Sequence, residues 1–291
     1  MGRLERFISS DATLSIMAVD STDIVNRAAT IHASSAVVSA ALGRLLTAAT
    51  LMGAALKGKD DTITLHLKGG GPVGSVIAVA DSKGNARGYV TEPVVEIPLN
   101  DKGKLDVAAA VGTEGTLTVM KDLGLKEPYV GSVPIQTGEI AEDITAYFAI
   151  SEQIPTVCAL GVLVGKNLRI KAAGGFIIQL LPFAPEETID AVERCIQNIP
   201  SVTEMLSQGL TPEEMSKKVL PEFELELLDS SNPSYSCNCS RQRTERVLLT
   251  LSAEELDSMA EDEKIEVCCH FCPKRYVFTG DEIRQIASDK E

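Results

Sequence analysis

Tryptophan is missing from this chain of 291 residues, and aromatic residues make up only 4% of it. Hydrophobic residues nevertheless reach 44%. A folded core must therefore be built mainly from aliphatic side chains. At this length, two or three structural units are expected.

An excess of positive charge is also missing, because the formal net charge is −14. Non-specific binding to nucleic acid needs clustered Lys and Arg, whereas residues 222–291 carry 16 acidic and 8 basic side chains. We therefore expect no nucleic-acid partner and a surface whose acidity favours solubility. A zinc module that binds nucleic acid is a rival hypothesis, which salt-dependent binding to RNA or DNA would support.

No stretch reaches the roughly 18 uninterrupted apolar residues of a membrane helix, and the charged N-terminus predicts no secretory signal. We expect a cytoplasmic protein without a membrane partner. Thiols stay reduced in that compartment, so a cysteine cluster there indicates metal binding or redox sensing. A cluster of structural disulfides, which is the alternative, would need an oxidising compartment.

Five of the seven cysteines lie between Cys237 and Cys272. They include a Cys-x-Cys pair, at 237 and 239, and a later Cys-x-x-Cys pair, at 269 and 272. Zinc prefers a tetrahedron of soft thiolate ligands, and the tight turn of Cys-x-x-Cys aims two sulfur atoms at one point. We therefore predict that one zinc ion is bound by Cys237, Cys239, Cys269 and Cys272.

The remaining cysteines fit this site less well. Cys268 directly precedes Cys269 and should point to the opposite face of a strand, which makes it a poor ligand. His270 could replace one sulfur, and that alternative stays open. Cys158 and Cys195 lie in apolar patterns and are expected to be inert core residues.

Enzymatic activity is not expected, because His32 and His66 have no Ser, Cys or carboxylate partner at the spacing of a catalytic triad. A thiol oxidoreductase is a second rival hypothesis. In such an enzyme the Cys-x-x-Cys motif should open a helix within a βαβ pattern. Here the pattern instead predicts a β-hairpin over residues 265–267 and 276–278, with the motif at its tip.

Hydrophobic patterning predicts an α+β core domain over residues 1–181, with a mainly antiparallel sheet and packed helices. The Ala-rich segment 34–57 has helical spacing and predicts a largely buried helix against a sheet. Strands are predicted before and after it, at residues 12–19, 62–68, 75–80 and 86–91.

The composition of the chain changes after Pro182. Residues 182–230 contain short helical pieces and little apolar area. This predicts a helical linker region that must pack against another part of the protein to be stable. A break in composition at residues 230–234 then predicts a hinge. It leads into a redox-sensing zinc-binding domain over residues 231–291.

The predicted zinc domain is small and has few large apolar residues. A structural zinc can supply on the order of 10–16 kcal/mol of folding free energy, so the domain is not expected to fold without it. Thiolates are also the oxidisable form of cysteine, which would couple oxidation to metal loss and local unfolding. An inert structural zinc site is the alternative, and cysteine spacing alone favours it.

Three groups of residues match a known family. They are residues 40–46 (AALGRLL), residues 147–148 with 151–156 (YF and SEQIPT), and residues 237–240 with 267–272 (CNCS and VCCHFC). With these, the chain resembles the heat-shock protein 33 family of bacterial redox-regulated chaperones. The resemblance covers essentially the whole length, and the spacing of its two cysteine motifs is specific to that family.

The resemblance implies an N-terminal α+β domain, a helical linker and a C-terminal zinc domain. It implies that the four cysteines bind zinc when reduced, and that oxidation pairs Cys237 with Cys239 and Cys269 with Cys272. The linker then unfolds, homodimers form, and the protein holds unfolding client proteins without using ATP. Cys268 departs from the family pattern, which leaves open the sulfur that pairs with Cys272 under harsh oxidation.

Overall fold

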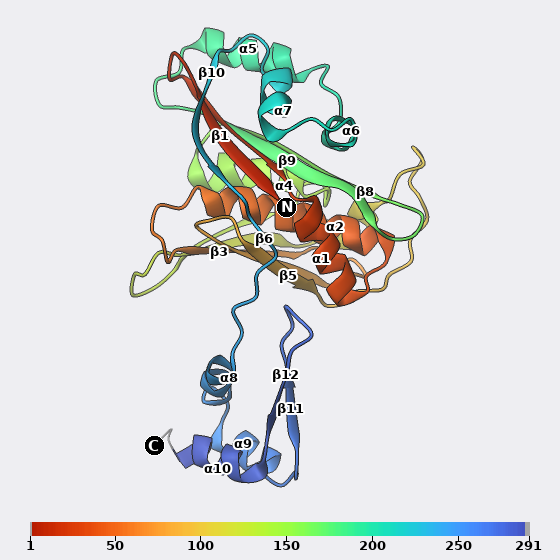
Figure 1. The fold of residues 1–291 in the computed structure, drawn as a ribbon, viewed down its shortest axis with the longest axis vertical. Coiled ribbons are helices and arrows are strands. Elements are labelled where there is room, and N and C mark those ends of the chain that lie inside the picture. Colours follow the sequence, from red (N-terminus) through yellow and green to blue (C-terminus); the bar gives the residue numbers. More distant parts are fainter. Residues whose placement is uncertain (1, 289–291) are drawn as a thin grey trace. The chain divides into compact units, whose positions relative to one another are not determined.

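A computed structural model of the chain describes residues 2–288. The chain divides into two compact units, of which the first ends at Ser236 and the second begins at Cys237. The first unit contains two antiparallel sheets with packed helices, and the second contains a hairpin with short helices (Figure 1). The predicted α+β class is confirmed, whereas the finer division at residues 181 and 230 stays a prediction.

The first sheet has five strands, and each is antiparallel to its neighbours. In spatial order they are β10 (Leu225–Ser231), β1 (Arg3–Ser9), β2 (Leu14–Asp20), β9 (Ile170–Leu180) and β8 (Thr156–Val164). The order joins residues from both ends of the first unit, so this sheet forms only when distant parts of the chain meet.

The second sheet is built mostly from one continuous stretch of chain, which includes the predicted strands at residues 62–68, 75–80 and 86–91. Its antiparallel strands, in spatial order, are β5 (Ala86–Val90), β4 (Ser75–Asp81), β3 (Thr62–Lys68), β6 (Thr116–Asp122) and β7 (Tyr129–Pro134). Alternating residues of β3 are buried, which is the period of two that the sequence shows.

Helix α2 (Ala36–Ala54) forms the centre of the first unit and contacts strands of both sheets (Figure 1). By length and composition it is apolar enough to cross a membrane, but 89% of its most apolar window is buried inside the protein. Its small residues permit this close packing. A Cβ atom at Gly43 would lie 2.5 Å from a methyl carbon of Val25 on α1 (Thr22–His32). The predicted buried helix is therefore confirmed.

Further helical segments complete this layer: α3 (Val107–Val111), α4 (Ala141–Tyr147) and the π-helical turn η1 (Phe148–Glu152). Tyr147 is fully buried and donates a hydrogen bond to Glu152. Glu152 also accepts a hydrogen bond from Lys121 of β6, 2.6 Å away. Tyr147 and Glu152, from the matched YF and SEQIPT segments, thus tie the helical layer to the second sheet.

The outer face of the first sheet is covered by α5 (Glu186–Ile196), α6 (Val202–Ser207) and α7 (Pro212–Val219) (Figure 1). Their apolar side chains form a second core with residues of β1, β2 and β9, including Phe7, Leu14, Ile16, Phe176 and Ile178. The helices of the predicted linker region, which is expected to need packing against another part of the protein, thus pack on an apolar face of the first sheet.

The second unit contains α8 (Arg241–Leu248), α9 (Ala253–Met259), the hairpin of β11 (Ile265–Cys268) and β12 (Arg275–Phe278), and α10 (Gly280–Ser288). A capping box opens α9, because Ser252 and Glu255 bond to each other's backbone N–H groups. The buried hydrophobic core of this unit is small: Leu248, Leu256, Ala260, Ile265, Phe278 and Ile283.

Two strands of the first sheet differ from the sequence prediction. The first strand was expected at residues 12–19, but β1 precedes it and lies in the interior of the sheet. The prediction for residues 182–230 contains only short helical pieces, whereas residues 225–231 form strand β10. β1 and β10 pair with each other, so each is stabilised by a partner from the opposite end of the first unit that no local pattern reveals.

Glu5 is an unusual residue for the interior of a sheet. It lies on β1 opposite Ala18, on the face that α5–α7 cover, and it is only 2% exposed. Its Oε1 atom accepts two hydrogen bonds from Arg3, at 2.6 and 2.9 Å, whereas Oε2 has no hydrogen-bond partner among the described residues. A buried carboxylate that is only partly paired has a net desolvation cost.

We therefore expect Glu5→Met to raise the free energy of unfolding of the first unit by about 1 kcal/mol, because it removes that cost. Arg3→Met should lower this free energy by about 2 kcal/mol, because it leaves the Glu5 carboxylate buried without a counter-charge. Urea denaturation followed by circular dichroism measures both effects. Arg6→Met is the control, since the Arg6–Asp229 pair is solvent-exposed and should change stability by less than about 1 kcal/mol. A destabilising effect of Glu5→Met would contradict the expectation.

Candidate metal centre

Cys237 and Cys239 lie on an irregular segment that leads directly into α8. Ser240 ends this segment as the N-cap of α8, and its hydroxyl accepts a hydrogen bond from the backbone N–H of Arg243 at 3.2 Å. The cap fixes where the helix begins. It thereby keeps the two cysteines outside the helix, where alternate residues can turn their side chains toward one point.

Cys269 and Cys272 lie in the turn of the β11–β12 hairpin, where the sequence predicted them. The N–H of Cys269 donates a hydrogen bond to the carbonyl of Lys274 at 3.0 Å, and the N–H of Cys272 donates to the carbonyl of Cys269 at 3.4 Å. These bonds fold the segment into a tight turn. The Cys-x-x-Cys motif does not open a helix here, so its setting differs from that expected of a thiol oxidoreductase.

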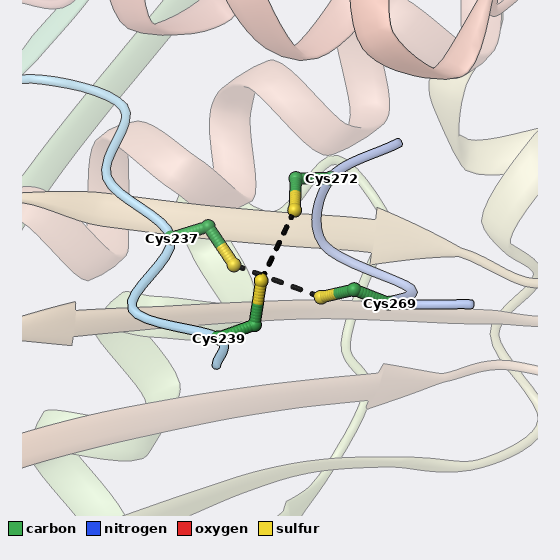
Figure 2. Close-up of side chains that lie close together, drawn as sticks. All are labelled: Cys237, Cys239, Cys269 and Cys272. Carbon is green, nitrogen blue, oxygen red and sulfur yellow. Dashed lines mark hydrogen bonds between the residues drawn. The ribbon is translucent and has the colours of Figure 1, made fainter. Parts of the chain in front are cut away.

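The four sulfur atoms converge from these two segments, and Figure 2 shows them pointing toward a common centre. The Sγ atoms of Cys237 and Cys269 are 3.6 Å apart, and those of Cys239 and Cys272 are 3.4 Å apart. All four lie within 4.8 Å of one another. The structure thus brings together the four cysteines that the spacing singled out.

This group could hold a metal ion. Four sulfur atoms on a tetrahedron with Zn–S distances of ~2.3 Å would lie ~3.8 Å apart, and the observed separations are close to that value. An all-sulfur set suits soft or borderline cations and not magnesium or calcium. The geometry and the donor atoms therefore fit zinc, although the identity of the metal stays a prediction.

The thiols differ in their tendency to ionise. Burial raises the pKa of Cys237 to about 12 and also raises the pKa of Cys272. Burial acts in the same direction on Cys239, but hydrogen bonds from Tyr276 and the neighbouring thiols outweigh it and lower that pKa to about 7. Because metal ligation needs thiolates, a bound cation would supply the positive charge that the other sulfurs need.

Two residues that sequence reasoning missed support the sulfur atoms. The hydroxyl of Tyr276 on β12 donates a hydrogen bond to Cys239 Sγ at 3.1 Å, and this bond raises the pKa of Tyr276 to about 12. Arg241, the first residue of α8, reaches the backbone carbonyl of Val277 at 2.6 Å. Neither contact can be predicted from the spacing of the cysteines, because both depend on how α8 packs against the hairpin.

The other candidates lie outside the sulfur group. Cys268 is exposed on β11 opposite Arg275, and His270 is exposed in the turn. Cys158 is partly buried against the central core, and Cys195, on α5, is buried in the core that α5–α7 form with the first sheet. Burial raises the pKa of both of these thiols, which keeps them in the unreactive protonated form, as expected for core residues.

Comparison with known proteins identifies the family. The family model described as "Hsp33 protein" matches residues 2–279. The chain belongs to the Hsp33 family. A 33 kDa chaperonin of Agathobacter rectalis is 49% identical over 282 residues, which cover 97% of this chain and 98% of the relative. One of Clostridium beijerinckii is 44% identical over 288 residues, which cover 99% and 98%.

A solved structure agrees with this assignment. The crystal structure of the 33 kDa chaperonin of Thermotoga maritima, a heat shock protein 33 homolog, matches with a TM-score of 0.90 and 37% sequence identity. The match covers 99% of this chain and 98% of that chain. The predicted family is therefore confirmed, and with it a chaperone function in place of an enzymatic one.

Substitution of adjacent cysteines tests the ligand set. Cys269→Ser should lower zinc affinity by more than about 100-fold, because the loss of a ligand costs more than the 10–100-fold typical of an outer-shell group. Cys268→Ser, one residue away, should leave the affinity unchanged because its sulfur is outside the group. Competition with a chromophoric chelator under reducing conditions measures both affinities. Equal affinities in the two variants would exclude the proposed ligands.

Proposed function

We propose that this Hsp33 family member is a redox-regulated, ATP-independent holdase that acts in the cytoplasm. Its reduced form binds one zinc ion through Cys237, Cys239, Cys269 and Cys272 and is inactive. Oxidation of these cysteines activates it to bind unfolding proteins and prevent their aggregation under oxidative and heat stress. The observation that carries the proposal is the convergence of four thiols in a unit with only a small hydrophobic core.

The chemistry of the switch needs an oxidant such as a peroxide. A thiolate attacks one peroxide oxygen and the O–O bond breaks. A sulfenic acid forms, and the hydroxide that leaves takes up a proton and becomes water. A second thiol attacks that sulfur, an S–S bond forms, and a second water leaves. Each disulfide thus consumes two thiols and one peroxide, so four thiols consume two peroxides. Sulfur atoms joined in this way no longer supply thiolate ligands, and the metal-dependent part of the folding free energy is lost.

The pairing of the sulfur atoms decides whether oxidation opens the unit. Disulfides within each motif, Cys237–Cys239 and Cys269–Cys272, leave the two segments free to separate. Disulfides between the motifs would cross-link two segments that are distant in the sequence and would stabilise the folded unit. The sulfur pairs that lie 3.6 and 3.4 Å apart in the reduced arrangement both join one motif to the other. We propose the pairing within motifs, because only this pairing converts oxidation into unfolding.

The client-binding state requires apolar surface, and the first sheet has it beneath α5–α7. We propose that residues 182–230 form a linker that unfolds upon oxidation and uncovers this face. The support is that α5–α7 cover an apolar strip of β1, β2 and β9, while α6 and α7 are only 6 and 8 residues long. Such short helices depend on packing for their stability. The activated protein is proposed to form a homodimer, without nucleic-acid or membrane partners.

Light scattering of a thermally unfolding client protein tests this function. The peroxide-treated protein should suppress aggregation at a molar ratio at which the reduced zinc form has little effect. Equal suppression by both forms would rule out the switch. Peptide mapping of the same oxidised sample should give Cys237–Cys239 and Cys269–Cys272, with release of one zinc ion per chain. Active protein with disulfides between the two motifs would contradict the proposed opening.

A further inference from the structure

Arg241 connects three elements of the second unit. Its Nη1 atom donates a hydrogen bond to the carbonyl of Val277 on β12 at 2.6 Å, and its Nη2 atom donates to Glu282 on α10 at 2.6 Å. Its Nε atom lies 3.4 Å from a carboxylate oxygen of Glu245 on α8 itself. The guanidinium carbon lies 4.2 Å from the centre of the Phe278 ring, within the range of cation–π attraction.

These contacts lie beside the sulfur site. Arg241 follows Cys239 by two residues, and Val277 follows Tyr276, whose hydroxyl donates to Cys239 Sγ. Strand β12 therefore holds the Cys-x-Cys segment at two neighbouring points, one through a sulfur atom and one through the guanidinium. The same strand continues directly from the turn that carries Cys269 and Cys272. Neither point of attachment requires a metal.

We propose that Arg241 is a positioning residue of the sulfur site. Its contacts with β12 hold the Cys237-x-Cys239 segment against the hairpin turn. They thereby slow the separation of this segment from the turn. Arg241 then governs how readily the site loses its metal. This inference rests on the proposed function in so far as the four sulfur atoms bind zinc.

An arginine is suited to this position where a lysine is not. The planar guanidinium lies against the Phe278 ring while separate N–H groups reach the Val277 carbonyl and two carboxylates. A lysine ammonium is a compact charge on a flexible stem and cannot reproduce the stacked, forked arrangement. The exposed ion pairs contribute little free energy by themselves. The carbonyl and ring contacts fix the orientation of the segment.

The test compares Arg241→Lys with Arg243→Lys in the full-length, reduced, zinc-loaded protein. Arg243 lies on the same helix, and its side chain has no hydrogen bond or ion pair among the described residues. Transfer of zinc to a chromophoric chelator, without oxidant, should be faster in Arg241→Lys by on the order of tenfold, as is typical of supporting groups around a metal. Arg243→Lys should match the wild-type rate. Wild-type rates in both variants would overturn the proposal and leave the proposed function intact.

Cobalt substitution separates positioning from general stabilisation. The sulfur-to-cobalt absorption bands report the geometry of the ligands, so they should shift in Arg241→Lys and stay unchanged in Arg243→Lys. An unchanged spectrum in Arg241→Lys, together with a lower melting temperature, would show that Arg241 only stabilises the unit. That result would overturn the positioning role.

A wild-type chain that bound no zinc would refute the proposed function and would leave this inference to a second measurement. Amide hydrogen exchange of the reduced, metal-free chains would then decide it. Residues 237–240 and the β11–β12 hairpin should exchange faster in Arg241→Lys than in Arg243→Lys. Equal exchange in the two variants would overturn the positioning role in that case.

Discussion

The close approach of four sulfur atoms is the constraint on which the second unit depends. Sulfur atoms 3.4–3.6 Å apart cannot all carry negative charge unless a cation lies among them. Burial already favours the neutral thiol at Cys237 and Cys272. Because its apolar core is small, this unit has few other interactions that stabilise its fold. In the proposed function, the folding of this unit is therefore tied to the ionisation and oxidation state of these four sulfur atoms.

The centre of the first unit is instead held together by hydrophobic packing. Its central helix is packed between two sheets, with small residues that allow close contact and no dependence on thiol chemistry. Its two cysteines are held in the protonated form by burial. A chain built in this way can lose the structure of the second unit while the central helix of the first unit persists. That property is expected of a protein that must work while other proteins unfold.

The parts of the fold that depend on nearby residues were predictable from the sequence. The buried helix follows from its three- and four-residue spacing, the second sheet from its meander, and the sulfur group from two cysteine motifs. β1 was not predictable, because Glu5 occupies a buried position and hides the alternation that would mark a strand. β10 was missed for a related reason, since among the described residues it pairs only with β1, at the other end of the first unit. Arg241 and Tyr276 carry no motif, and their contacts exist only once α8 and the hairpin have packed.

The helices α5–α7 lie between β9 and β10, two strands of the same sheet that these helices cover. If residues 182–230 unfold, most of β10 is released together with the helices, which then remain tethered to the sheet through β9. Their effective concentration at the apolar face then stays high, on the order of millimolar for a short flexible tether. The protein would thus carry its own competitor for any polypeptide held on that face. Refolding of the helices could displace a bound chain by mass action alone, which would make release a property of the covalent connectivity and not of an energy source.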